Sequence, residues 1–169
     1  MSVIGIYSRA FCGTTITMRL LSCIPGTVTA GETFRLLPPV ARHRHCALCG
    51  MGTPCPVFTP SFLSRRFTTH DLYRQLSTQL GTGKTMIVSD KDPAHYEAAL
   101  GKGKMNTIIL VRNPLAVVRS DLERSIRFKT PEASLAFYVK RFSAAEKWCK
   151  GWSRRYVIVA LESLLRHPQ

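Results

Sequence analysis

Segments with the pattern of buried strands alternate with segments with the pattern of amphipathic helices along the chain. Runs rich in β-branched residues predict strands over 2–8, 85–89, 106–111 and 156–161. Apolar residues at helical spacing predict helices over 14–23, 71–80, 115–127 and 132–152. Since strands that alternate with helices form a parallel sheet, we expect an α/β fold of three layers, with helices on both faces of the sheet.

The length and composition favour a single domain over residues 1–169. A chain of 169 residues, of which 45% are hydrophobic, can bury a core of its own. Between residues 42 and 60, Gly, Pro, Cys and His are dense. Helix and strand breakers at this density predict an irregular insertion into the domain.

The balance of charge is strongly basic. Lys and Arg number 24 and Asp and Glu number 10, so the net charge of +14 favours polyanionic ligands such as nucleotides, nucleic acids or sulfated glycans. No apolar run reaches the ~20 residues that span a bilayer, and the apolar start over 1–7 is too short for a signal peptide. Six cysteines are too few to force a disulfide framework, so we expect a cytoplasmic protein that does not bind a membrane.

Polar segments follow three of the predicted strands. They are Ser8–Thr15, Asp90–Pro93 and Arg112–Pro114. In a parallel sheet the carboxyl ends of the strands share one edge, and ligands bind in the crevice beyond that edge. The sequence therefore predicts a ligand site to which all three segments contribute.

The loop from Ser8 to Thr15 joins a predicted strand to a predicted helix. Backbone N–H groups in such a loop, together with the positive end of the helix, bind phosphate groups. Compared with the phosphate loop G-x-x-x-x-G-K-[ST], Ser8 replaces the first Gly and Thr14 replaces the Lys, which argues against an ordinary nucleoside triphosphatase. The alternative without a ligand is a tight turn at Gly13 with Thr15 as a helix cap. A second partial match over 81–85 follows a predicted helix and precedes a predicted strand, the reverse of the order that a phosphate loop requires.

Four blocks of the sequence carry a wider pattern. They are Cys12–Thr33, Ser89-Asp-Lys-Asp-Pro93, Leu110-Val-Arg-Asn-Pro-Leu-Ala-Val-Val-Arg-Ser120 and Val157–Leu164. In this order they resemble the motifs of sulfotransferases, especially those of the tyrosylprotein and bacterial branches. The resemblance implies a P-loop-like domain that moves a sulfuryl group from 3′-phosphoadenosine-5′-phosphosulfate to a hydroxyl acceptor, with no metal required.

The resemblance also implies roles for individual residues. The nucleotide co-substrate is expected to bind Arg9, Cys12, Gly13, Thr14, Thr15, Arg112 and Ser120. Arg112 and Ser120 correspond to the pair that binds the 3′-phosphate, for which a planar guanidinium and a hydroxyl are suited. Glu32, 19 residues after Gly13, corresponds to the catalytic base, and Lys91, or Arg9, to a cation that stabilises charge on the bridging oxygen.

Two features depart from the family. Arg9 stands four residues before Gly13, whereas relatives carry a basic residue two positions before, where this chain has Phe11. The chain also ends at Gln169, where relatives continue. We therefore expect an abbreviated C-terminal part and an acceptor site that is incomplete or shared with another chain.

Alternatives remain for the residues and for the function. Glu32 is also compatible with a solvated surface position, and Arg112 with a structural ion pair to Asp121. A catalytically impaired protein that binds polyanions or nucleic acid would use the same charge, although its basic residues lack the interleaved aromatic side chains of single-strand binders, so nucleic acid is not the expected partner. A P-loop kinase is a further alternative, against which the missing Lys beside Gly13 argues.

A cluster of His and Cys residues lies within the predicted insertion. It consists of His43, His45, Cys46, Cys49 and Cys55. These are ligand types for a tetrahedral structural zinc ion. A second pair of cysteines at CxxC spacing is missing, so a turn that packs reduced thiols is the alternative.

Overall fold

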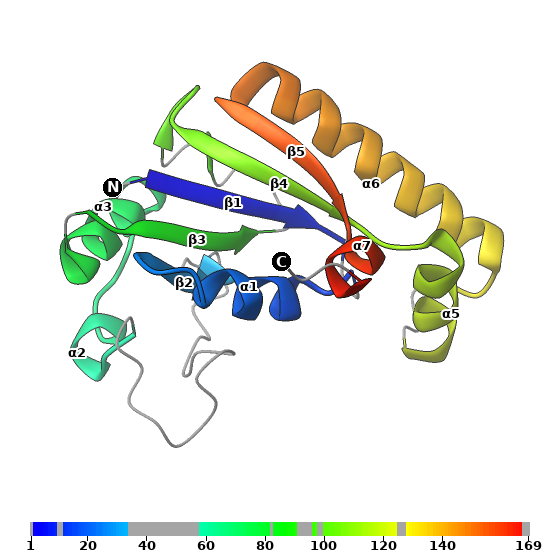
Figure 1. Cartoon of the computed structure of the whole chain (residues 1–169), viewed down its shortest axis with the longest axis horizontal. Helices are drawn as coiled ribbons and strands as arrows, with labels where there is room; N and C mark the ends of the chain where they lie inside the picture. Colours follow the sequence, from blue (N-terminus) through cyan, green and yellow to red (C-terminus); the bar gives the residue numbers. More distant parts are fainter. Residues whose placement is uncertain are drawn as a thin grey trace.

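The strands form one parallel sheet. Figure 1 shows the computed structural model of the chain, which describes residues 2–9, 12–33, 58–81, 83–90, 96–97, 100–124 and 128–166. The strands are β1 (Ser2–Ser8), β2 (Thr27–Gly31), β3 (Thr85–Asp90), β4 (Met105–Val111) and β5 (Arg155–Ala160). They lie in the order β2-β3-β1-β4-β5, and each pair of neighbours is parallel. The predicted parallel sheet is confirmed.

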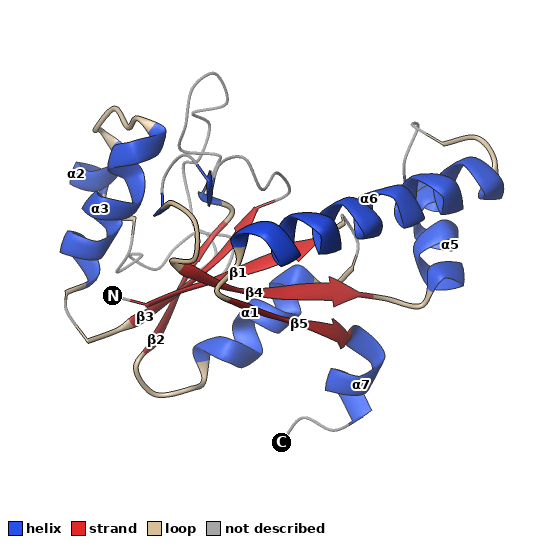
Figure 2. Ribbon diagram, turned by 90° about the horizontal axis from the view of Figure 1, so that it is seen from above, coloured by secondary structure: helices blue, strands red, loops and turns tan. Residues whose placement is uncertain are grey.

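Helices cover both faces of this sheet. They are α1 (Thr14–Ser22), α2 (Pro60–Leu63), α3 (Thr69–Leu80), α5 (Pro114–Arg124), α6 (Pro131–Trp152) and α7 (Leu161–Arg166). In Figure 2, α1 and α7 lie on one face of the sheet, and α2, α3 and α6 lie on the other. The buried clusters agree, because Ile6 of β1 packs with Met18 of α1 and Leu161 of α7, whereas Tyr7 packs with Ala145 of α6. Successive residues of a strand point to opposite faces, which is why these two neighbours belong to different clusters.

The largest buried cluster lies beneath α2 and α3. Phe62 of α2 and the pair Leu72 and Leu76 of α3 are fully buried with Met86 and Val88 of β3. Each such side chain stabilises the fold by roughly 1.5–3 kcal/mol. This cluster anchors the β3 side of the sheet.

The turn over 81–85 is a connection and not a phosphate loop. α3 begins after Thr68, whose Oγ1 accepts a hydrogen bond from the N–H of Asp71 at 3.2 Å. It ends at Gly81, where φ is +81°, and β3 starts at Thr85. The turn therefore connects a helix to the amino end of a strand, as the sequence predicted, whereas a phosphate loop connects a strand to a helix.

Most of the predicted insertion lies outside the described residues. Of positions 42–60, the structure describes 58–60, where Thr59 caps α2. The His and Cys cluster over 43–55 and Lys91, which is expected to stabilise charge on the bridging oxygen, also lie outside the described residues. Among the described helices, none combines the length and the apolar composition that crossing a bilayer requires.

Candidate functional site

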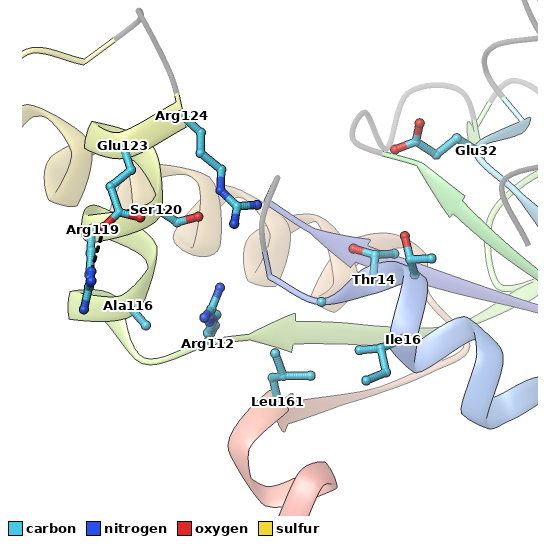
Figure 3. Close-up of a pocket in the computed structure, with 12 residues that line it drawn as sticks. Thr14, Ile16, Glu32, Arg112, Ala116, Arg119, Ser120, Glu123, Arg124 and Leu161 are labelled. Atoms are coloured by element: carbon cyan, nitrogen blue, oxygen red, sulfur yellow. Dashed lines mark hydrogen bonds and ion pairs between the residues drawn. The ribbon is translucent and has the colours of Figure 1, made fainter.

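A pocket opens at the carboxyl ends of β1 and β4. These neighbouring strands lead in opposite directions, because β1 continues through α1 to β2 on one side of the sheet, and β4 continues through α5 and α6 to β5 on the other. Such a divergence creates the crevice in which open parallel sheets bind ligands. The pocket has a volume of about 790 Å³. Its described lining residues, drawn in Figure 3, are Gly13, Thr14, Thr15, Ile16, Glu32, Arg112, Ala116, Arg119, Ser120, Glu123, Arg124 and Leu161.

The start of α1 forms one wall of the pocket. The first backbone hydrogen bond of the helix joins the N–H of Thr17 to the carbonyl of Gly13 at 3.0 Å. The N–H groups of Thr14, Thr15 and Ile16 come earlier in the chain and therefore have no acceptor within the helix. Among the described residues, no side chain caps this end of the helix. Since all three residues line the pocket, their N–H groups and the positive end of α1 are suited to bind an anion. Because α1 begins at Thr14, Thr15 lies within the first turn, and the alternative in which it caps the helix is wrong.

Gly13 is required at its position for two reasons. Its φ of +83° lies in the left-handed region, which disfavours side chains with a Cβ. A Cβ here would also lie 2.6 Å from Cδ2 of Leu161, the buried first residue of α7. The phosphate-loop candidate is therefore packed directly against α7.

Arg112 is held at the end of β4 through its backbone. The hydroxyl of Tyr138 on α6 donates a hydrogen bond to the Arg112 carbonyl at 2.8 Å and accepts one from the Arg112 N–H at 3.2 Å. The next N–H, that of Asn113, donates to Oε1 of Glu162 on α7 at 2.9 Å. Burial raises the pKa of Tyr138, so its hydroxyl keeps the proton that it donates. These contacts fix the turn from which the Arg112 side chain enters the pocket.

α5 supplies a hydroxyl and further charged groups. Figure 3 shows the side chains of Arg112, Ser120 and Arg124 at the same end of the pocket. The remaining charged pair of this helix is Arg119 and Glu123, whose Nε and Oε1 lie 2.7 Å apart. The hydrogen bond from Arg119 lowers the pKa of Glu123 and keeps its carboxylate ionised. The positive charge of Arg124 also lowers the pKa of Glu123, and its guanidinium is suited to bind an anion beside Ser120.

Sequence reasoning missed Arg124, although a signal for it exists. Arg124 follows Ser120 by four residues, and residues at this spacing share one face of a helix. Once Ser120 is placed at the pocket, the position of Arg124 follows.

Glu32 lies at the opposite end of the pocket. It follows β2, in which the register with β3 shifts between Thr29 and Gly31, and Gly31 has a φ of +67°. The next residue, Thr33, is buried and its hydroxyl lies 3.0 Å from the hydroxyl oxygen of Tyr73. Such a bulge redirects the residue that follows it. Glu32 is half-buried and lines the pocket, which does not fit the alternative of a fully solvated position.

No protein-family model matches this chain, and no curated protein is detectably similar to it. What the protein does must therefore be inferred from the geometry of the pocket. Of the residues that the sequence singled out, Gly13, Thr14, Thr15, Glu32, Arg112 and Ser120 meet there. They come from three segments that are distant in the sequence.

Arg9 and Cys12 do not line the pocket among the described residues. The Arg9 side chain is 7% exposed and forms an ion pair with Asp121 of α5, the carboxylate that the alternative for Arg112 names as its partner. The N–H of Cys12 donates to the Arg9 carbonyl at 3.3 Å. Burial raises the pKa of the Cys12 thiol to about 11, which keeps it neutral and unreactive. Both residues belong to the loop before α1 without lining the pocket.

The described residues contain no group of His, Cys, Asp and Glu that could hold a metal ion. Besides the carboxylates of Glu32 and Glu123, the lining residues offer guanidinium groups, hydroxyls and backbone N–H groups. This donor set is suited to phosphate and sulfate oxygens.

Proposed function

We propose that this protein is a sulfotransferase, which moves a sulfuryl group from 3′-phosphoadenosine-5′-phosphosulfate to a hydroxyl acceptor. The proposal is supported by one observation: the start of α1, Glu32, Arg112 and Ser120 all line the same pocket. The sequence resemblance names these same positions. They are separated by up to 107 residues, from Gly13 to Ser120, so local sequence similarity alone does not bring them together.

The pocket has two anion sites that suit a nucleotide phosphorylated at both ends. Arg112, Ser120 and Arg124 bind the 3′-phosphate at one end, where guanidinium groups form charge-assisted hydrogen bonds. The N–H groups of Thr14 and Thr15 bind the 5′-phosphosulfate at the start of α1. The volume of about 790 Å³ lies within the range of roughly 300–1,000 Å³ that is usual for sites of small ligands.

Glu32 supplies the base for the transfer. It accepts the proton of the acceptor hydroxyl as the hydroxyl oxygen forms a bond to sulfur and the bond from sulfur to the 5′-phosphate oxygen breaks. The N–H groups at the start of α1 stabilise the charge that grows on that oxygen, and 3′-phosphoadenosine-5′-phosphate is released. Lys91 is the cation that the resemblance implies for the same role.

Calorimetric titration with 3′-phosphoadenosine-5′-phosphate, run beside ATP at the same salt concentration, tests the proposal. We expect the wild type to prefer the 3′-phosphorylated nucleotide. The Arg112→Ala variant is expected to lose affinity by about tenfold or more, because a charge-assisted hydrogen bond contributes roughly 1.5–3 kcal/mol. Arg74→Ala removes an exposed arginine of α3 that pairs with Asp71, and serves as the matched control.

A preference for ATP would favour a kinase. Binding to neither nucleotide, together with salt-dependent binding to DNA, would favour the protein that binds polyanions.

A further inference from the structure

A buried ion pair joins the end of β1 to α5. Arg9 directly follows β1, and its side chain is 7% exposed, while that of Asp121 is 2% exposed. The guanidinium group donates to Oδ2 of Asp121, and the Ser134 hydroxyl of α6 donates to the same oxygen. The rings of Phe128 and Phe137 lie 5.0 Å from the guanidinium carbon, measured to each ring centroid. Arg9 therefore fills a closed site between the first strand and the α5–α6 pair.

This ion pair is one of the contacts that hold α5 in place. Figure 1 shows α5 beyond the carboxyl ends of the strands, against the start of α6. Its buried residues are Val117 and Asp121, whereas Leu115 is 79% exposed and Leu122 is 40% exposed. Asp121 is thus one of the two residues that α5 buries, and its ion pair contributes to where the helix lies.

The residues of α5 that line the anion site adjoin this anchor. Ser120 immediately precedes Asp121, and Arg124 follows it by three residues, about one helical turn. The backbone of Arg112, by contrast, is held by Tyr138 of α6. One part of the anion site is thus fixed by β4, and the other part depends on where α5 lies.

We propose that Arg9 is a positioning residue, which sets the preference for a 3′-phosphate by holding Ser120 and Arg124 in the pocket through Asp121. This inference rests on the proposed function of the pocket. Arg9 touches no ligand in this arrangement. Instead of binding the nucleotide, the Arg9 side chain links the loop before α1 to α5.

The test compares two ligands that differ only in the 3′-phosphate: 3′-phosphoadenosine-5′-phosphate and adenosine 5′-phosphate. The variant Arg9→Ala/Asp121→Ala removes the anchor without leaving a buried charge unpaired. We expect its affinity for the 3′-phosphorylated ligand to fall by about tenfold or more, and its affinity for adenosine 5′-phosphate to stay within about twofold. A loss of stability alone would weaken both ligands equally. The matched control is Arg74→Ala/Asp71→Ala, which removes an exposed ion pair of α3.

The possible outcomes separate the two proposals. If the wild type shows no preference for the 3′-phosphate, the proposed function fails and the role of Arg9 fails with it. If the wild type shows the preference and the folded double variant keeps it within twofold, the role of Arg9 is overturned and the proposed function stands. Should the double variant not fold, Arg9→Lys gives the answer: this variant keeps the charge but loses the guanidinium fork, so the preference is expected to fall in the same direction, and an unchanged preference overturns the inference.

Discussion

Replacing Gly13 by Ala perturbs the start of α1 in two separable ways. The backbone must keep a φ of +83°, which costs a residue with a Cβ about 1–2 kcal/mol. The new Cβ would also lie 2.6 Å from Cδ2 and 2.8 Å from Cδ1 of Leu161. Overpacking of this kind costs about 1–3 kcal/mol more. The expected total is therefore about 2–5 kcal/mol of unfolding free energy.

Gly26→Ala is the matched control for this prediction. Gly26 follows α1 and has a φ of +78°, close to that of Gly13. A Cβ at Gly26, however, meets no described atom within 4 Å. Gly26→Ala is thus expected to cost only the backbone part, about 1–2 kcal/mol, and the difference between the two variants measures the contact with Leu161.

The assay is urea unfolding of both variants, alone and combined with Leu161→Ala. In the Leu161→Ala background the extra cost of Gly13→Ala is expected to shrink to the backbone part, which gives a coupling energy of about 1–3 kcal/mol. The reasoning is refuted if Gly13→Ala costs no more than Gly26→Ala, or if removing the Leu161 side chain leaves its cost unchanged.

Three further predictions concern the pocket and the loop that precedes α1. Glu32→Gln is expected to slow transfer from 3′-phosphoadenosine-5′-phosphosulfate by about 10²–10⁴-fold while calorimetry shows nucleotide affinity within about twofold; equal losses of both would show that Glu32 binds rather than accepts a proton. Arg124→Ala is expected to weaken binding of 3′-phosphoadenosine-5′-phosphate by about tenfold, and not that of adenosine 5′-phosphate, because its guanidinium lies with Ser120. Cys12 is buried with a pKa raised to about 11, so iodoacetamide at pH values well below this is expected to modify exposed Cys23 and leave Cys12 unmodified in the folded protein. Rapid modification of Cys12, detected by peptide mass spectrometry, would contradict its placement.

Four of the five described strands follow from the sequence because their signals are local, whereas β2 and α7 are not predicted. β1 covers Ser2–Ser8 as predicted, since the β-branched residues Val3, Ile4 and Ile6 are followed there by the polar residues Ser8 and Arg9. The last predicted strand was placed over 156–161, but β5 covers Arg155–Ala160 and Leu161 begins α7. An apolar Leu suits either element, and only its packing against Gly13 distinguishes them.

The site could be predicted only in part. Positions at strand ends, such as Gly13 and Arg112, follow from topology because parallel strands share one edge for their carboxyl ends. The placement of Arg9 does not follow, since a guanidinium binds either a phosphate or a buried carboxylate. Its partner Asp121 lies 112 residues away, and no local pattern joins the two.

A crystal structure of the protein with 3′-phosphoadenosine-5′-phosphate would test the central claim most directly. The account predicts the 3′-phosphate between Arg112, Ser120 and Arg124, and the 5′-phosphate at the N–H groups of Thr14 and Thr15. A nucleotide bound in the opposite orientation, or bound outside this pocket, would contradict it.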